Sequence, residues 1–233
     1  MEIIGIIGAM ESEVKSLCSE LETIEKFEFG GLVFNKGLLC KKAVVIVKSG
    51  IGKVNAALCA QALITKFGAT KVINTGIAGA TGGNLGVFDF VVSEEAVYHD
   101  FDTTAFGYKL GQVPEMAERF VADKKMVDCA VDCFNKTKFA AEHKILKGLI
   151  ASGDQFISAG EKKDFIKKNF NPLCVEMEGS AIAHACTLNK VPFIIVRCMS
   201  DMADESVEQT YSFNEDVCAQ MSAEFVKNLV SEL

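Results

Sequence analysis

The sequence predicts an α/β protein, a three-layer α/β/α sandwich built on a mixed, largely parallel central sheet. Short apolar runs rich in β-branched residues alternate with segments of helical periodicity along the whole chain. Additional strand-like runs cluster in residues 26–48 and account for the mixed character of the sheet. No linker, repeat or low-complexity tract interrupts the 233 residues, so residues 1–233 are expected to form one domain.

The first third of the chain opens with a predicted buried strand over residues 2–7. A helix is expected over residues 9–21, because Val14, Leu17 and Leu21 recur at helical spacing. The glycine pair Gly30-Gly31 suits the tight turn of a hairpin, and strands are expected over residues 26–29, 32–39 and 43–48. A helix over residues 54–67 follows, and Gly68 is its C-cap signal.

The remaining two thirds continue the alternation. Residues 76–83 are predicted to be a glycine-rich loop, and residues 99–116 form the longest irregular segment. Strands are expected over residues 71–75, 89–97, 145–152, 175–178 and 192–199. Helices are expected over residues 123–134, 159–169, from after 178 to 188, and over 214–230.

Composition excludes several classes of protein. The net charge of −7 disfavours general binding to nucleic acids or anionic membranes, since both require a basic surface. Nine cysteines, with no Cys-x-x-Cys pair, indicate free thiols in a reducing cytoplasm. The three histidines lack metal-ligand spacing, so neither a metal nor another cofactor is expected. No apolar stretch is long enough to span a bilayer, and a cytoplasmic protein is predicted.

Two glycine loops follow predicted strands without matching a nucleotide-binding motif. Residues 49–53 lack the upstream glycine and the Ser/Thr after lysine of a P-loop, and residues 76–82 lack the Gly-x-Gly of a dinucleotide site. Either loop could let the backbone approach a small ligand, or serve only as a tight turn. The residues leave both interpretations open.

Four acids and one arginine stand where predicted strands end. Glu13 follows the first strand, Glu176 and Glu178 end a later one, and Asp201 follows Arg197 at the last. Each acid alone is typical of a solvated surface, and Glu178 could simply favour the first turn of a helix. Because parallel strands place their carboxyl ends at one edge, the acids are expected to converge as acid/base equipment. No Gly-x-Ser-x-Gly nucleophile motif competes.

Eight stretches taken together carry a resemblance to one family. The chain resembles the bacterial 5′-methylthioadenosine/S-adenosylhomocysteine nucleosidases of the nucleoside phosphorylase superfamily, in order and at nearly constant spacing as far as about residue 213. The stretches are residues 5–13 (GIIGAMESE), 48–54 (KSGIGKV), 74–79 (NTGIAG), 98–100 (YHD), 104–108 (TAFGY), 152–157 (SGDQFI), 175–178 (VEME) and 200–204 (SDMAD).

This resemblance implies a cytosolic homodimer that uses water to cleave adenine from a 5′-thio-substituted ribose, without a cofactor. Asp201 would protonate the five-membered ring of adenine, and Glu13 would activate water beside Arg197. Glu178 would hold the ribose hydroxyls. The remaining expected substrate-binding residues are Met10, Ile51, Ile77, Phe156, Ile157, Glu176, Met177, Ser200 and Phe213, with Phe106 and Tyr108 supplied by the partner subunit.

More specific roles follow from the same resemblance. Met177 would pack beneath the sugar, Phe156 would stack on the purine, and the backbone of Ile157 would read its edge. Met10, Ile51 and Phe213 would line the thioalkyl pocket. Ile77 stands where the family often has Ser or Thr.

The chemistry of the residues is compatible with these roles. An acid and a base need opposite protonation states, which burial of one carboxyl and a polar or cationic neighbour for the other can supply. Glu178, at a predicted helix N-terminus, is expected to stay charged. A carboxylate at Glu13 disfavours phosphate as the nucleophile, because two like charges about 4 Å apart cost roughly 4 kcal/mol at an effective dielectric near 20. Alternatives are a nucleosidase for another adenine nucleoside, such as 5′-deoxyadenosine or an aminodeoxyfutalosine-type substrate, and a non-catalytic nucleoside sensor.

Overall fold

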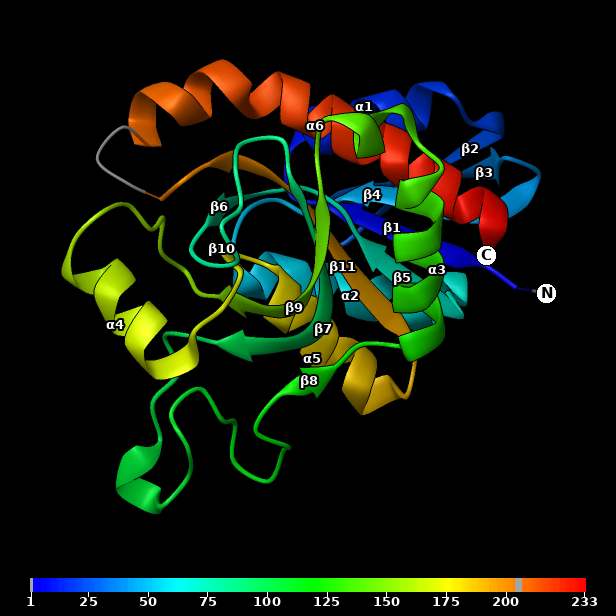
Figure 1. The fold of residues 1–233 in the computed structure, drawn as a ribbon. Coiled ribbons are helices and arrows are strands. Elements are labelled where there is room, and N and C mark those ends of the chain that lie inside the picture. The colour runs from blue at the N-terminus through cyan, green and yellow to red at the C-terminus, as the bar shows by residue number, and fades with distance from the viewer. Residues whose placement is uncertain (1, 204–206) are drawn as a thin grey trace.

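The computed structural model describes residues 2–203 and 207–233, without the side chains of residues 207–213. In these ranges a mixed sheet has the strand order β2-β3-β4-β1-β5-β11-β6-β10-β9-β7-β8 (Figure 1). The strands are β1 (Ile4–Gly8), β2 (Glu22–Phe29), β3 (Leu32–Leu39), β4 (Lys42–Lys48), β5 (Lys71–Asn74), β6 (Ile77–Ala80), β7 (Phe90–Tyr98), β8 (Phe120–Val121), β9 (Ile145–Ser152), β10 (Cys174–Glu176) and β11 (Phe193–Asp201).

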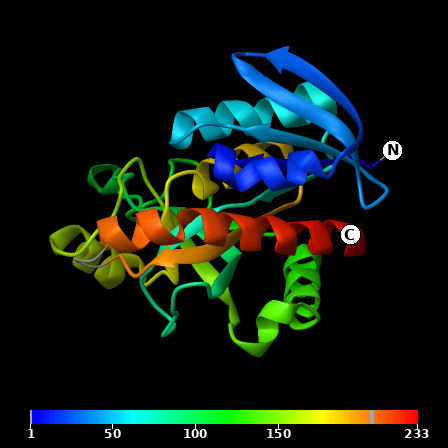
Figure 2. The ribbon, with the colours of Figure 1, turned by 90° about the horizontal axis from the view of Figure 1, so that it is seen from above.

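Helices cover both faces of this sheet (Figures 1 and 2). On one face α6 packs against α1 and α3, and on the other α2 packs against α5. The helices are α1 (Glu11–Ser19), α2 (Lys53–Phe67), α3 (Lys124–Asn135), α4 (Glu161–Phe170), α5 (Gly179–Asn189) and α6 (Val207–Glu232), with short 3-10 turns η1 (Thr104–Phe106) and η2 (Lys138–Ala141). The three-layer arrangement predicted from the alternating pattern is confirmed.

Strand β11 belongs to two parts of the sheet at once. Its first half pairs in parallel with β5, and its second half pairs in parallel with β6 and antiparallel with β7. Because β6, β10, β9 and β7 are also joined in that order, these four strands and β11 close a ring of hydrogen-bonded strands. All nine residues of β11 are buried, so residues near its carboxyl end project from the centre of the molecule.

The structure corrects the direction expected for one strand. β10 runs antiparallel to β6, whereas β6 is parallel to β11. The carboxyl end of β10 therefore does not share a parallel edge with those of β1 and β11. Its acids reach the others because the ring of strands curls closed, a consequence of long-range pairing that local sequence pattern does not encode.

Several predicted boundaries also change. The glycine-rich loop expected over residues 76–83 contains β6, whose small residues allow close pairing with β10 and β11 on either side. Within the segment that follows residue 98, the structure adds η1 and the two-residue strand β8, which are too short for periodicity to reveal. α6 begins at Val207 instead of Asn214, and β2 begins at Glu22 instead of Lys26.

An aromatic cluster fastens α3 and α6 to β7. The rings of Phe90, Phe134 and Phe225 pack pairwise with centroids 5.2–5.7 Å apart, and each side chain is at most 1% exposed. Rings at these separations and tilts add an edge-to-face attraction to the burial of apolar surface. The cluster therefore holds α6 against β7, the strand that pairs with β11.

Replacing Phe225 with alanine should lower the free energy of unfolding by about 3–5 kcal/mol, because it leaves a cavity between α3, α6 and β7. Urea unfolding followed by circular dichroism measures this as a lower midpoint with an unchanged slope. Val217→Ala on the exposed side of α6 is the control, since its side chain is 46% exposed, and it should change stability by under about 0.5 kcal/mol. Equal effects of the two variants would contradict the structural role of the cluster.

Candidate active site

One cavity gathers most of the residues expected to bind a ligand. It encloses about 640 Å³ of empty space, including the open solvent at its mouth. Its predicted lining residues are Met10, Glu13, Ile51, Ile77, Phe156, Ile157, Glu176, Met177, Glu178, Ser200 and Asp201. Ala9, Ala78, Gly79, Gln155 and Val175 also line it and were not singled out as site residues, although all five lie inside stretches that carry the family resemblance.

Glu13 is buried in the first turn of α1, at the carboxyl end of β1. Its Oε2 accepts hydrogen bonds from the backbone N–H groups of Ala9 and Met10 at 2.6 and 3.0 Å, and its Oε1 accepts one from Ile77 at 3.1 Å. Burial raises the pKa of Glu13, while the charge of Arg197 and these N–H groups act in the opposite direction. A buried carboxyl of this kind is a stronger base than an exposed one once it is ionised.

The glycine before β6 is required by the position of Glu13. A Cβ at Gly76 would lie 2.5 Å from Glu13 Oε1 and 3.3 Å from the guanidinium of Arg197. Only a glycine lets the backbone approach so closely. The backbone of the second glycine loop thus does approach another group closely at this position, but that group is a protein carboxylate, and the approach to a small ligand stays a prediction.

Asp201 projects into the cavity from the last position of β11. The Ser200 hydroxyl donates to its Oδ2 and the backbone N–H of Ala203 donates to its Oδ1, each at 2.7 Å. The pairing of β11 with β6 shifts register between Met199 and Asp201, which marks a β-bulge. Bulges re-aim side chains, and here the neighbours Ser200 and Asp201 both face the cavity instead of opposite sides of the sheet.

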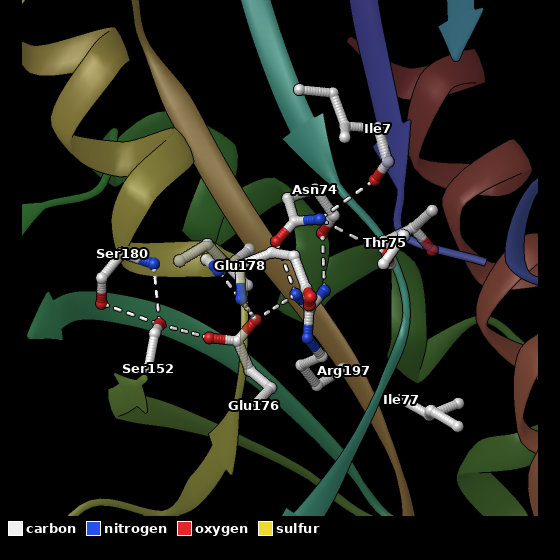
Figure 3. Close-up of polar contacts among 12 residues, drawn as sticks. Ile7, Asn74, Thr75, Ile77, Ser152, Glu176, Glu178, Ser180 and Arg197 are labelled. Carbon is white, nitrogen blue, oxygen red and sulfur yellow. Dashed lines mark hydrogen bonds and ion pairs between the residues drawn. The ribbon is translucent and has the colours of Figure 1, made fainter. Parts of the chain in front are cut away.

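Glu176 forms a buried ion pair with Arg197 behind the cavity (Figure 3). Arg197 Nη2 lies 2.5 Å from Glu176 Oε2, which also accepts the backbone N–H groups of Glu178 and Gly179 at 3.0 and 2.8 Å. Its Oε1 accepts a hydrogen bond from the Ser152 hydroxyl. Although burial opposes its charge, Arg197 and these donors hold the pKa of Glu176 below its usual value. Glu176 is therefore a permanently charged anchor.

Glu178 is the acid whose expected state the structure corrects. Its side chain does not cap α5; instead its Oε1 accepts the backbone N–H of Gly52, next to the start of α2, at 2.8 Å. Burial and the charge of Glu176 raise the pKa of Glu178 to about 7. The sequence predicted a permanently charged side chain at a helix N-terminus, but burial beside a second carboxylate outweighs the helix.

Four predicted site residues lie outside the cavity lining. Arg197 sits behind it, and its guanidinium pairs with Glu176, which lines the cavity. Phe106, 81% exposed, and Tyr108 lie on the segment between β7 and β8, which projects away from the sheet as a green loop (Figure 1). Phe213 lies on α6, but its side chain falls outside the described residues.

Neither a metal-ligand cluster nor a membrane-spanning helix occurs among residues 2–203 and 207–233. No group of three or more His, Cys, Asp or Glu side chains in these ranges is arranged to hold a metal ion. Within the same ranges no helix is both long and apolar enough to cross a bilayer. The cavity is lined by carboxyl groups and apolar side chains, and the buried Arg197 lies behind Glu176.

Comparison with known proteins identifies the family of this fold and cavity. The family model described as "Phosphorylase superfamily" matches residues 3–233. A 5′-methylthioadenosine/S-adenosylhomocysteine nucleosidase of Staphylococcus saprophyticus is 42% identical over 232 residues, covering 99% of this chain and 100% of that protein. The chain belongs to the 5′-methylthioadenosine/S-adenosylhomocysteine nucleosidase family. Members of this family are N-glycosyl hydrolases within the phosphorylase superfamily, and the chain is an enzyme of this class.

Solved structures of nucleosidases have the same fold. The Neisseria meningitidis nucleosidase in complex with methylthio-immucillin-A superposes with a TM-score of 0.96 at 38% identity, with 100% of both chains covered. The Colwellia psychrerythraea nucleosidase in complex with adenine also gives 0.96, at 40% identity, covering 100% of this chain and 96% of that one. The nucleoside phosphorylase-like fold expected from the sequence is confirmed.

The opposite pKa directions of Glu178 and Glu176 lead to opposite effects of neutralising them. Folding raises the pKa of Glu178 from 4.5 to about 7. The stability that depends on its neutral carboxyl is therefore complete only below pH 4.5, and it is lost as the pH rises through about 7. Glu178→Gln should therefore stabilise the ligand-free protein at pH 8, by up to about 3 kcal/mol, and have little effect at pH 4.5. Glu176→Gln should destabilise it at both values by about 3–5 kcal/mol, because Arg197 is left as an unpaired buried charge.

Thermal unfolding of the two variants and the wild type at pH 4.5 and pH 8 measures these differences. Both substitutions are isosteric, so each variant is the steric control for the other. If Glu178→Gln were as destabilising at pH 8 as Glu176→Gln, the assignment of a strained charge to Glu178 would be wrong.

Proposed function

We propose that the chain hydrolyses the N-glycosidic bond of 5′-methylthioadenosine and S-adenosylhomocysteine to adenine and the thio-substituted ribose, without a metal or other cofactor. The observation that carries this proposal is the meeting of Glu13, Glu178 and Asp201 on one cavity, each with different hydrogen-bond partners. Three carboxyl groups in three environments can act as a proton donor, a proton acceptor and a hydrogen-bond acceptor for the sugar hydroxyls.

Asp201 acts in this proposal as the general acid toward the five-membered ring of adenine. Protonation there makes adenine a neutral leaving group, and the bond to the ribose then breaks with oxocarbenium-like character at the sugar. The contacts from Ser200 and Ala203 fix the direction of the carboxyl group, and Asp201 lines the cavity. Phe156, 53% exposed at the rim, offers a ring for stacking on the purine, and the backbone of Ile157 reads the edge of the base.

Glu13 acts as the base that takes a proton from the attacking water. Backbone N–H groups on both of its oxygens hold the carboxylate still, and Arg197 lies close enough to influence its charge. The structure also supports water over phosphate as the nucleophile. Among the described residues that line the cavity there is no Lys or Arg to bind a phosphate, and the charge of Glu13 repels one.

Glu178 holds the ribose hydroxyls, with Met177 packing beneath the sugar. Its Oε1 is oriented by Gly52, and hydroxyl groups that donate to a carboxylate favour its charged form. With a pKa of about 7 in the free protein, Glu178 should lose its proton as the nucleoside binds. Met10 and Ile51 line the end of the cavity proposed for the thioalkyl substituent.

We further propose that the active enzyme is a homodimer in which Phe106 and Tyr108 complete the partner's pocket. α5 contacts both α2 and β8, and each of these elements carries exposed apolar side chains: Val54 is 70% exposed, Leu58 64%, Leu188 63% and Val121 68%. Exposed apolar side chains on neighbouring elements are candidates for an interface. Ile51 of the cavity wall precedes Val54 by three residues and is itself 54% exposed, so the pocket borders this surface.

One assay tests the proposed reaction. Purified protein incubated with 5′-methylthioadenosine should release free adenine at the same rate with and without phosphate, followed by chromatography. Strict dependence on phosphate would identify a phosphorylase, and tight binding without adenine release would identify a sensor. A parallel series with S-adenosylhomocysteine, 5′-deoxyadenosine and aminodeoxyfutalosine determines the preferred 5′ substituent.

In the same assay, Asp201→Asn and Glu13→Gln should each lower kcat by roughly 10²–10⁴-fold, the usual contribution of a positioned acid or base. Nucleoside binding measured by calorimetry should persist in both, because the base and sugar contacts remain. Full activity of either variant would remove its assigned role. Gln220→Ala, on the exposed side of α6, serves as the control.

Leu58→Asp should convert the dimer to a monomer, because it places a charge in the apolar surface of α2. Light scattering after size-exclusion chromatography gives the mass, and activity should fall together with the dimer fraction. Phe106→Ala should leave the dimer intact and raise KM. A fully active monomer would refute the shared pocket.

A further inference from the structure

A charged cluster at the edge of the cavity involves no residue to which a catalytic or binding role has been assigned. Lys53 Nζ lies 2.7 Å from both carboxylate oxygens of Asp100 and 3.7 Å from Asp154 Oδ2. It also lies 5.3 Å from the centre of the Tyr98 ring, within cation–π range. The side chains of Lys53 and Asp100 are only 22% and 13% exposed, so water screens this pair less than an ordinary surface ion pair.

Backbone hydrogen bonds close the same three residues into a ring, here called the Lys53 clasp. The backbone N–H of Lys53, the first residue of α2, donates to Asp154 Oδ1 at 2.8 Å. The backbone N–H of Asp154 in turn donates to Asp100 Oδ2 at 2.9 Å. The clasp thus joins three chain segments: the start of α2, the end of β7 and the loop after β9.

Two of these segments adjoin residues that line the cavity. Asp154 directly precedes Gln155, Phe156 and Ile157, the wall proposed to hold the base. Lys53 directly follows Gly52, whose N–H holds the Glu178 carboxylate proposed to grip the sugar.

Gly52 also permits the close approach that the clasp requires. Its φ of 98° is in the region that favours glycine, and a Cβ there would stand 3.2 Å from Asp154 Oδ1. The distance between the base wall and the Glu178 carboxylate is therefore set by a short path through Asp154, Lys53 and Gly52.

Electrostatics explain why a lysine closes the ring. The N-terminus of α2 receives two carboxylates, Glu178 at Gly52 and Asp154 at Lys53, and the helix dipole favours both. Asp100 adds a third acid against the same segment. Lys53 supplies the positive charge among them, and without it Asp154 would lose an ionic partner that ties the base wall to the start of α2, beside Glu178.

We propose that the Lys53 clasp is a positioning device that fixes the distance between the base wall and Glu178, so that a ligand held at both ends depends on it. This inference rests on the proposed nucleosidase function. It predicts different behaviour for two ligands of the same cavity, the nucleoside and free adenine. A nucleoside must satisfy the base wall and Glu178 together. Free adenine contacts the base wall and Asp201 alone, and it can follow the wall if that wall shifts.

The test compares 5′-methylthioadenosine with adenine in Asp154→Ala and Lys53→Met. Each variant should raise KM for the nucleoside about tenfold, the effect of losing one charge-assisted hydrogen bond, while kcat and the inhibition constant of adenine stay within about twofold. The double variant should show little additional loss, because either change opens the same ring. Lys53→Arg keeps the charge and should recover most of the affinity.

A purely structural role gives a different result. Asp154→Ala could weaken the binding of adenine and of the nucleoside equally. It could also lower kcat and the melting temperature without changing the ratio of the two binding affinities. Either result would show that the clasp is not a positioning device. Lys124→Met, which removes an exposed ion pair with Asp128 on α3, is the matched control and should change none of these values. Asp154→Asn, which keeps an acceptor for Lys53 N–H, serves if the alanine variant does not fold.

Failure of the proposed function is recognised separately. Should the wild-type protein release no adenine, that function falls, and the same comparison made by calorimetry with both ligands still decides the role of the clasp. Nucleoside binding that is unchanged in Asp154→Ala and Lys53→Met would then show that the clasp is not a positioning device.

Discussion

A single buried ion pair, Arg197 with Glu176, is the interaction on which the rest of the site depends. Arg197 is 2% exposed on β11, and its guanidinium lies among the carboxyl groups of Glu176, Glu13 and Glu178. Placing a charge in this interior is unfavourable unless it is paired, and Glu176 is the partner that contacts it directly. The pair also has a geometric consequence, because Glu176 accepts the N–H groups that shape the turn from β10 into α5. Glu178 is carried on that turn.

One cation among several acids divides their protonation behaviour. Glu176 takes most of the benefit of Arg197 and keeps a low pKa, whereas burial raises the pKa of Glu13 and of Glu178. A site with two spare positive charges would have ionised all of these groups and would also have attracted phosphate. The shortage of positive charge thus leaves a carboxyl beside the proposed water position and another ready to respond to ligand hydroxyls. The Lys53 clasp supplies its positive charge farther out, where it organises the walls without neutralising the proposed catalytic acids.

Most of the fold was predictable because it rests on local patterns. The strand over residues 2–7, the helix after it and the hairpin at Gly30-Gly31 each follow from periodicity or turn chemistry, and the structure has all three. The strand β6 was missed because Ile77–Ala80 is short and rich in small residues, so only its pairing with β10 and β11 makes it a strand. The convergence of Glu13, Glu178 and Asp201 was expected, but β10 runs antiparallel to β6, and the expected reason therefore holds only for β1 and β11.

The sequence by itself determined the class of fold, the motifs of the nucleosidase family and the identity of the acids, because these depend on residue type and short spacing. Only the tertiary structure decided which carboxyl pairs with Arg197 and how the β-bulge turns Ser200 and Asp201 into the cavity together. It also decided that Lys53, Asp100 and Asp154 meet, although about 50 residues separate each from the next along the chain. The physical reason is that charge state and wall separation depend on desolvation and on contacts between distant strands. Neither quantity exists until the ring of strands around β11 has closed.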